Sequence, residues 1–160
     1  MDVLVPRNGS IGNVVTALSK KLSLDGSTRP PIRIYEAQAG KIHRELNEDV
    51  SVLGISEYGV LYAEKIPEEE LNSSQQDQAI YCFHFDKEPT KPHSVPFKFV
   101  LKPGESMRDM RERLSQRTYI RGKLMDKVRL AIVSRVLYSK PRYLEEGKDS
   151  FPYFTSLSLG

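Results

Sequence analysis

Hydrophobic residues recur along this chain with both helical and strand periods, and the mixture predicts an α+β fold. The clearest helical stripe comprises Ile11, Val14, Val15, Leu18 and Leu22. In the same part of the chain, β-type runs are predicted at 3–5, 32–37, 41–46 and 61–66. Helix and strands together therefore predict one small packed unit near the amino terminus.

A polar connector separates this unit from a second one. Pro67 ends the fourth β-run because proline cannot donate to a strand ladder, and the next ten or so residues are acidic and then rich in Ser and Gln. The β-signal returns at Ile80, with Tyr81, Phe83 and Phe85 on one face and Ile80, Cys82 and His84 on the other. We therefore predict two modules in tandem, residues 1–71 and 77–160.

The first module has the element order of a β-grasp fold without one strand of its opening hairpin. Ser10 is placed to cap the helix, and Lys20 and Lys21 lie in its last turn, where cations suit the helix dipole. Asp25-Gly26-Ser27 ends the helix, Pro30-Pro31 prevents its resumption, and 49–53 is expected to be irregular or a single turn. Either the chain is cut inside the hairpin, or another segment supplies the missing edge.

The second module contains a complete opening hairpin. Strands are predicted at 80–85 and 96–101, with Phe97, Phe99 and Leu101 on one face and a long loop over 86–95. Ser106 with Asp109 three residues on resembles a capping box, and a helical stripe follows at Met107, Met110 and Leu114. A third strand is predicted at 128–133, 136–138 extends it or starts a fourth, and 140–144 is a turn into the tail. Each module is thus expected to be a β-grasp, a mixed sheet packed on one helix.

Charge divides the chain at the same connector. Residues 1–76 carry 8 Lys/Arg and 11 Asp/Glu, a balance of −3, whereas residues 77–160 carry 16 and 10, a balance of +6. The excess of positive charge lies on the second helix and the segment after it. The predicted protein-binding residues there are Arg108, Arg111, Arg113, Arg117 and Lys123. Arg121, Lys127 and Arg129 extend the same basic run. Three interpretations stay open: a solvated face, a docking site for an acidic protein, and a nucleic-acid surface. Only Tyr119 interrupts this run, so base stacking has little support.

No catalytic, cofactor-binding or metal-binding residues are predicted. Cys82 and His84 share a strand face, but side chains two residues apart on a regular strand lie about 7 Å from each other, too far for direct proton transfer. His43, His84 and His93 lack the clustered spacing of a zinc site. Calcium-loop and phosphate-loop patterns are also missing. An independent cysteine hydrolase is therefore rejected.

Length and composition indicate the cellular compartment in which the protein is expected. No stretch approaches the roughly 20 apolar residues of a membrane span, and the amino terminus has no secretion-signal pattern. One cysteine cannot form an internal disulfide, which suits a reducing compartment. We expect a nuclear and cytoplasmic protein with no membrane partner.

With both modules in view, the chain resembles the carboxyl-terminal tandem ubiquitin-like region of the herpesvirus-associated ubiquitin-specific protease family. The resemblance covers nearly the whole chain, and its segments follow the family's order. They are 5–7 with 12–15, 32–36 with 41–42, 63–70, 80–85, 96–97 with 103–105, and 141–144. Two departures are noted: the first strand of the penultimate domain is missing, and the tail after the last domain is missing or much shortened.

The resemblance implies a role as well as a fold. In that family five ubiquitin-like domains follow a papain-like cysteine protease core that removes ubiquitin from substrates, and the last two domains and the tail are implied to activate the core by folding back onto it. The expected function is a non-catalytic regulatory and partner-docking module of such a deubiquitinase, with its catalytic domain outside this sequence. The expected partners are that catalytic domain and other proteins. The alternative is a free-standing basic nucleic-acid-binding module.

Overall fold

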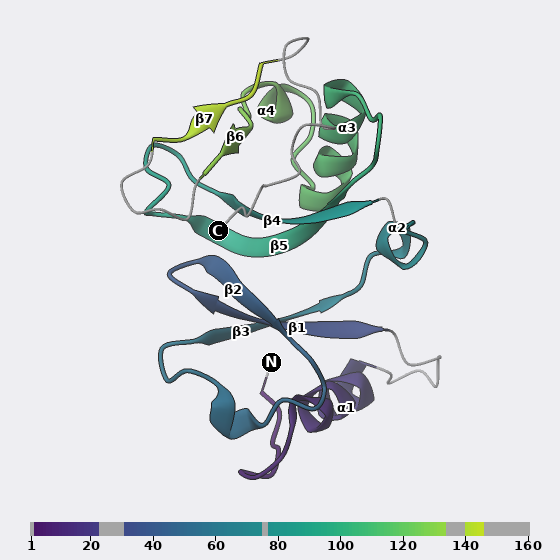
Figure 1. Cartoon of the computed structure of the whole chain (residues 1–160), viewed down its shortest axis with the longest axis vertical. Coiled ribbons are helices and arrows are strands. Elements are labelled where there is room, and N and C mark those ends of the chain that lie inside the picture. Colours follow the sequence, from purple (N-terminus) through teal and green to yellow (C-terminus); the bar gives the residue numbers. More distant parts are fainter. Residues whose placement is uncertain (1, 23–30, 75–76, 134–139, 146–160) are drawn as a thin grey trace. The chain divides into compact units, whose positions relative to one another are not determined.

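The chain folds into short helices and small antiparallel sheets, an α+β arrangement (Figure 1). The computed structural model describes residues 2–22, 31–74, 77–133 and 140–145. The helices are α1 Ile11–Leu22, α2 Glu68–Leu71, α3 Met107–Thr118, α4 Lys123–Asp126 and the 3₁₀-helix η1 Val52–Gly54. The strands are β1 Ile32–Gln38, β2 Lys41–Leu46, β3 Val60–Lys65, β4 Gln78–His84, β5 His93–Leu101, β6 Ala131–Ile132 and β7 Arg142–Tyr143.

Two compact units make up the molecule. The first consists of residues 1–72 with 83–96, and the second of 73–82 with 97–160. The outer part of the β4–β5 hairpin is therefore grouped with the first unit, although it follows the connector in sequence. The boundaries at 1–71 and 77–160 stay predictions.

Helix α1 confirms the predicted stripe. Ile11, Val14, Val15 and Leu18 are buried and pack on Ile34 and Leu46, whereas Leu22 is exposed. The first turn is capped mainly by backbone, because the amides of Ile11 and Gly12 donate to the carbonyls of Val50 and Glu48, each at 2.8 Å. These bonds satisfy donors that a helix start leaves without partners, and they fix the helix on the 48–52 segment.

The first sheet has the order β2-β1-β3, with both pairings antiparallel. The predicted strands at 32–37, 41–46 and 61–66 are confirmed with shifts of a residue or less, and η1 provides the single turn expected near 49–53. The prediction of a strand at 3–5 is wrong. Val3 and Val5 do pack against the core while Leu4 is 98 % exposed, so the alternation is real, but no described strand pairs with this segment.

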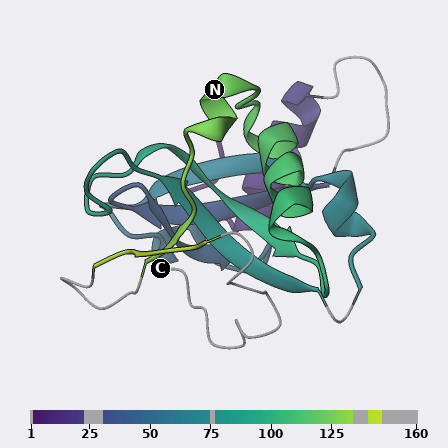
Figure 2. The same cartoon turned by 90° about the horizontal axis from the view of Figure 1, so that it is seen from above.

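In the second unit α3 lies against one face of the β4–β5 hairpin (Figure 1 and Figure 2). The buried cluster consists of Phe99, Leu101, Met107 and Met110, with Leu114 at its edge, which confirms both predicted stripes. The cap predicted at Ser106 is also confirmed: the Asp109 amide donates to Ser106 Oγ at 3.1 Å, and Ser106 Oγ donates to the Asp109 carboxylate at 2.6 Å. The interior of this unit is thus formed by the alternating apolar residues of β5 and the apolar stripe of α3, which pack against each other.

The carboxyl-terminal part departs from expectation. The strand predicted at 128–133 is reduced to β6, because the preceding residues form α4 and its closing turn. The segment predicted as a turn at 140–144 contains β7, which pairs antiparallel with β6. Predictions for Asp25-Gly26-Ser27, Pro30 and 136–138 lie outside the described residues. The helices of the described part are all too short or too polar to cross a bilayer.

Candidate functional site

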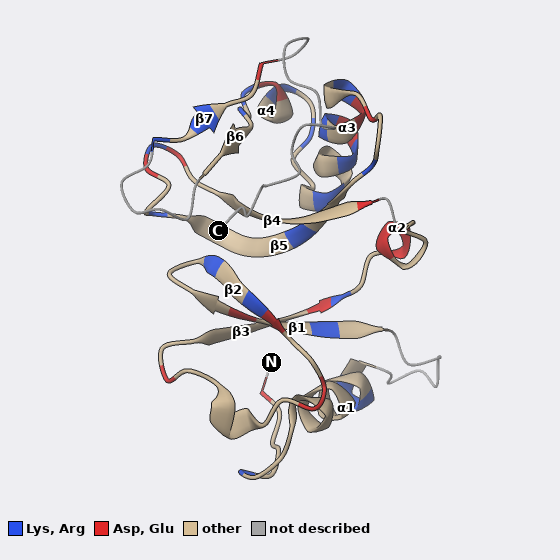
Figure 3. Ribbon diagram, in the orientation of Figure 1, with Lys and Arg blue, Asp and Glu red and all other residues tan. Residues whose placement is uncertain are grey.

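The cationic residues predicted to bind a protein divide into two groups in the structure. Arg108 on α3 and Lys123 on α4 are exposed. Arg111, Arg113 and Arg117 are partly buried, and Figure 3 shows the basic positions spread along α3. The guanidinium of Arg111 donates to the carbonyl of Val128 at 2.8 and 2.9 Å and so ties α3 to the segment after α4.

Arg113 is the most deeply engaged of the five. Its Nε lies 2.5 Å from Glu105 Oε1, its Nη2 donates to the Val100 carbonyl at 2.6 Å, and its Cζ lies 4.7 Å from the centre of the Phe99 ring. The side chains of Arg113 and Glu105 are only 14 % and 7 % exposed. This arginine therefore joins the residues before α3 to β5. Few of its hydrogen-bond donors are left to bind another protein.

Arg117 repeats the stacking one helical turn later. Its Cζ lies 5.1 Å from the centre of the Phe97 ring. Residues four apart on the helix thus cover rings two apart on β5, and each cation lies over an aromatic face. Protein binding by Arg108, Arg111, Arg113, Arg117 and Lys123 stays a prediction, and the exposed pair is the part of that set best placed for it.

The thiol of Cys82 faces the interior of the second unit, where it packs against the buried cluster of Phe99 and Met110. Burial raises the pKa of Cys82 to about 12, although the charge of Arg117 acts in the opposite direction. A thiol with this pKa is protonated at neutral pH and is a poor nucleophile. This environment agrees with the rejection of local thiol catalysis.

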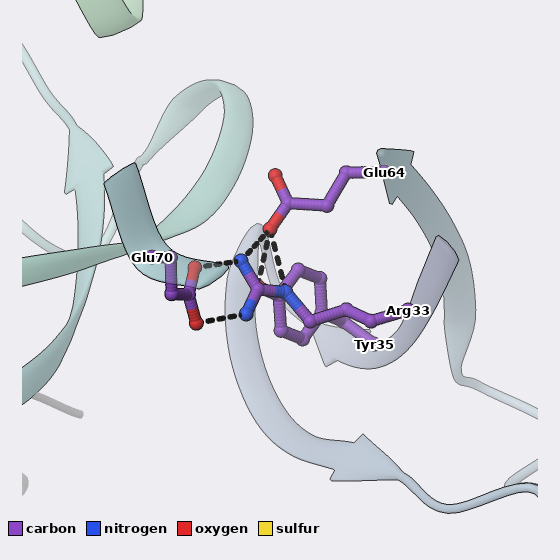
Figure 4. Close-up of polar contacts among 4 residues, drawn as sticks. All are labelled: Arg33, Tyr35, Glu64 and Glu70. Carbon is purple, nitrogen blue, oxygen red and sulfur yellow. Dashed lines mark hydrogen bonds and ion pairs between the residues drawn. The ribbon is translucent and has the colours of Figure 1, made fainter. Parts of the chain in front are cut away.

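A buried polar network that the sequence did not reveal occupies the first unit (Figure 4). Arg33 on β1 is 5 % exposed and donates to Glu64 Oε1 on β3 from Nε at 2.8 Å and from Nη2 at 2.5 Å. Its Nη1 and Nη2 also bind both carboxylate oxygens of Glu70 on α2, the second at 2.7 Å. The hydroxyl of Tyr35 donates to Glu64 as well.

The network has a clear electrostatic consequence. Burial alone lowers the pKa of Arg33, but its hydrogen bonds to Glu70 and Glu64 raise that pKa above its ordinary value. Burial and the bond to Glu64 raise the pKa of Tyr35. The guanidinium is thus held charged between two carboxylates, and α2, predicted to be an unanchored connector, is tied back to β1.

A further carboxylate on the same strand, that of Glu36, is almost completely buried. Its Oε1 accepts from the Ser56 amide at 2.8 Å and its Oε2 from Arg44 Nε at 2.6 Å, while Arg44 Nη2 donates to the Gly54 carbonyl. The bond from Ser56, followed by the bond from Arg44, lowers the pKa of Glu36. This carboxylate therefore holds the η1 segment on the sheet.

Two histidines meet on the β4–β5 hairpin. His84 ends β4 and His93 begins β5, and their Nδ1 atoms lie 3.1 Å apart. His93 Nε2 lies 3.4 Å from Asp86 Oδ1 in the intervening loop. Burial and the neighbouring His93 lower the pKa of His84, although the charge of Asp86 acts in the opposite direction.

An apolar groove runs between α1 and β3. Its volume is about 430 Å³, and its walls include Val14 and Leu18 from α1, Ile34 from β1, and Leu61 and Ala63 from β3. Among the residues that the structure describes, β3 pairs with β1 alone, so its other edge is open. The groove lies beside that open edge.

Comparison with known proteins places the chain in a family. The family described as "Ubiquitin-specific protease C-terminal" matches residues 1–158. The chain belongs to this family. Among its relatives, ubiquitin carboxyl-terminal hydrolase 15 of Schizosaccharomyces pombe is 27 % identical over 148 residues, which are 91 % of this chain. Ubiquitin C-terminal hydrolase 12 of Arabidopsis thaliana is 26 % identical over 151 residues, also 91 % of this chain.

A shorter match is closer in sequence. Ubiquitin carboxyl-terminal hydrolase 7 of Caenorhabditis briggsae is 39 % identical over 54 residues, 34 % of this chain and 5 % of the relative. The first two relatives are much longer than the chain, which covers 13 % of the length of each. The chain therefore corresponds to a small part of ubiquitin-specific proteases, and the resemblance inferred from the sequence is confirmed at the level of this family.

Proposed function

We propose that this chain is a non-catalytic regulatory region of a deubiquitinating cysteine protease and that it acts by docking on the catalytic domain of the same polypeptide. The observation that carries the proposal is the match of residues 1–158 to the C-terminal family of ubiquitin-specific proteases. Relatives named ubiquitin hydrolases extend far beyond the matched region, which leaves ample room for a separate catalytic domain.

The environment of Cys82 supports the proposal that this region is not itself catalytic. A papain-like enzyme needs a thiol of low pKa, a base within hydrogen-bond reach and a group that orients the base. Cys82 has a raised pKa and packs in a core, while His84 is paired with His93 instead. Hydrolysis of ubiquitin conjugates is accordingly assigned to residues elsewhere in the parent protein.

Each unit is proposed to be a ubiquitin-like β-grasp. Support in the first unit comes from the strand order β2-β1-β3, with α1 packed on the apolar face of the sheet. The open edge of β3 and the adjoining groove lie where the opening hairpin belongs in a β-grasp sheet. In the second unit the paired strands β4 and β5 precede the packed helix α3 as that fold requires. The narrower likeness to herpesvirus-associated members stays a prediction.

Docking is proposed to use the exposed cations of the second unit. Arg108, Arg121, Lys123 and Lys127 are exposed, whereas Arg113 is committed to Glu105. Exposed charges at the rim of an interface act mainly on the association rate, and their effect is screened by salt. The proposed partner surface is an acidic face of the parent's catalytic domain.

The test uses the full-length parent protease and a variant that lacks the region corresponding to this chain. Cleavage of a ubiquitin reporter is expected to be slower without the region, and it should recover partly when the 160-residue chain is added back. Charge reversal by Arg121→Glu and Lys123→Glu should reduce this recovery more at low salt than at high salt. Arg7→Glu, an exposed charge in the first unit, is the matched control.

Equal cleavage rates with and without the region would contradict the regulatory proposal. Nucleic-acid binding receives less support than the sequence suggested, because Arg111, Arg113 and Arg117 are occupied within their own unit. Titration with single- and double-stranded oligonucleotides at low salt separates the two functions, since a basic nucleic-acid surface would show affinity that falls steeply with salt. The nuclear and cytoplasmic location is likewise a proposal, and imaging of the tagged parent protein tests it.

A further inference from the structure

Three side chains with metal-binding atoms converge on the β4–β5 hairpin. His84 is the last residue of β4, His93 is the first of β5, and Asp86 lies in the loop between them. One ligand atom from each residue lies within 4.8 Å of the other two. The histidines are nine positions apart in sequence, and hairpin pairing removes that separation, which is why sequence spacing alone gave no zinc signal.

The two imidazole rings are oriented suitably for a shared cation. Their Nδ1 atoms face each other at 3.1 Å, with the rings at 82°. Zinc binds imidazole nitrogen at about 2.0–2.1 Å with tetrahedral angles, which places two such nitrogens about 3.4 Å apart. A cation between the rings therefore requires them to separate by only a few tenths of an ångström.

Asp86 is available as a third ligand. Its side chain is 81 % exposed and that of His93 is 45 % exposed, so both can reorient without disturbing the buried cluster of either unit. One carboxylate and two imidazole nitrogens leave a further position open to water, as in zinc sites with three protein ligands. Calcium and magnesium prefer all-oxygen shells, whereas imidazole suits zinc, copper and nickel.

We propose that His84, Asp86 and His93 form a surface site for a first-row divalent cation of the zinc class, with both Nδ1 atoms and one Asp86 oxygen as ligands. The cation would join the ends of β4 and β5 and close the loop between them. This inference does not rest on the regulatory role proposed above, because it needs only the hairpin. Its expected consequence is a hairpin whose opening is suppressed when the cation is bound.

The test uses the full 160-residue chain without an affinity tag and after removal of metal. Zinc is titrated in competition with a chromophoric chelator, and cobalt(II) is added separately as a spectroscopic probe of coordination. One equivalent of zinc is expected to bind. Zinc should shift the imidazole NMR signals of His84 and His93 but not that of His43, which is exposed on β2.

Three variants and two controls assign the ligands. His84→Asn and His93→Asn are each expected to abolish one-to-one binding, and Asp86→Asn should weaken it at least tenfold. His43→Asn and Cys82→Ser should bind zinc as the unchanged chain does. Circular dichroism of the metal-free variants checks their fold.

Two results would overturn the proposal. The first is the lack of one-to-one zinc or cobalt binding by the unchanged chain, a result that does not depend on how any variant folds. The second is binding that survives both His84→Asn and His93→Asn or that disappears in His43→Asn. Peptide-resolved hydrogen exchange provides an independent measurement: zinc should slow exchange in 84–93, and equal exchange with and without bound zinc would contradict the proposed closure.

Discussion

Replacing Glu70 by Gln tests whether the buried network anchors the end of the first unit. Glu70 is 12 % exposed and its two carboxylate oxygens bind two nitrogens of Arg33, which is itself 5 % exposed. The amide side chain keeps one acceptor but loses the charge and presents an NH₂ group to the guanidinium. Removing one partner of a buried ion pair costs about 3–5 kcal/mol.

The expected cost of Glu70→Gln is smaller because Glu64 still compensates Arg33. A hydrogen bond to a charged group contributes about 1.5–3 kcal/mol, so we expect the variant to lose about 2–3 kcal/mol of stability in the first unit. Arg33→Met leaves two carboxylates together without their cation and should cost about 3–5 kcal/mol. In a double-mutant cycle the two changes should show a coupling of about 1–3 kcal/mol.

Hydrogen exchange resolved to peptides is the suitable assay, because one urea transition cannot be assigned to either of two units. A loss of 2–3 kcal/mol should speed exchange through global opening of β1 by about 30- to 150-fold. Glu68→Gln, an exposed residue of the same helix, is the matched control and should change stability by less than about 0.5 kcal/mol. If Glu70→Gln behaves like Glu68→Gln, the network does not stabilise the unit and the reasoning is refuted.

Three further predictions concern single side chains. Arg113→Met should destabilise the second unit by about 3 kcal/mol in the same exchange assay, whereas Arg108→Met on the exposed face of α3 should cost less than about 0.5 kcal/mol; equal effects would contradict the structural role of Arg113. Ser106→Ala should cost about 1 kcal/mol through loss of the α3 cap, measured as faster amide exchange in the first turn, and unchanged exchange there would exclude the cap. Glu36 has a folded-state pKa below its ordinary 4.5, so its contribution to stability is complete above pH 4.5 and is lost as the pH falls through the folded value. As the pH falls below about 4.5, exchange in β1 should therefore accelerate more in the unchanged chain than in Glu36→Gln after correction for intrinsic rates, and parallel profiles would refute this linkage.

Local periodicity sufficed to predict much of the fold. Both long helices, their buried stripes and the cap at Ser106 follow from patterns within a dozen residues, where helix signals are strongest. The short strands were harder to predict. β6 and β7 contain two residues each, and β7 lies in a segment predicted to be a turn. Such pairs depend on tertiary contacts more than on propensity.

The Arg33 network could not be predicted because its members come from different elements. Arg33 and Glu64 are directly opposite each other in the antiparallel pairing of β1 with β3, so the strand register would have indicated that pair. Glu70 belongs to a run of three glutamates in a polar connector, and no local pattern distinguishes it from its neighbours. Only the position of α2 shows which of the three binds Arg33. The same limit applies to His84 and His93, which the hairpin brings together.

The use of arginine in α3 shows why charge counts overstate a docking surface. Residues 77–160 have a balance of +6, yet the guanidinium of Arg113 is matched by Glu105 and that of Arg117 covers an aromatic ring. Arginine suits such positions because its planar group stacks on rings and forms paired hydrogen bonds while its stem packs on apolar surface. Substituting these arginines would destabilise the unit whether or not they touch a partner. Evidence for docking must therefore come from Lys123 and its exposed neighbours, where loss of charge leaves the fold intact.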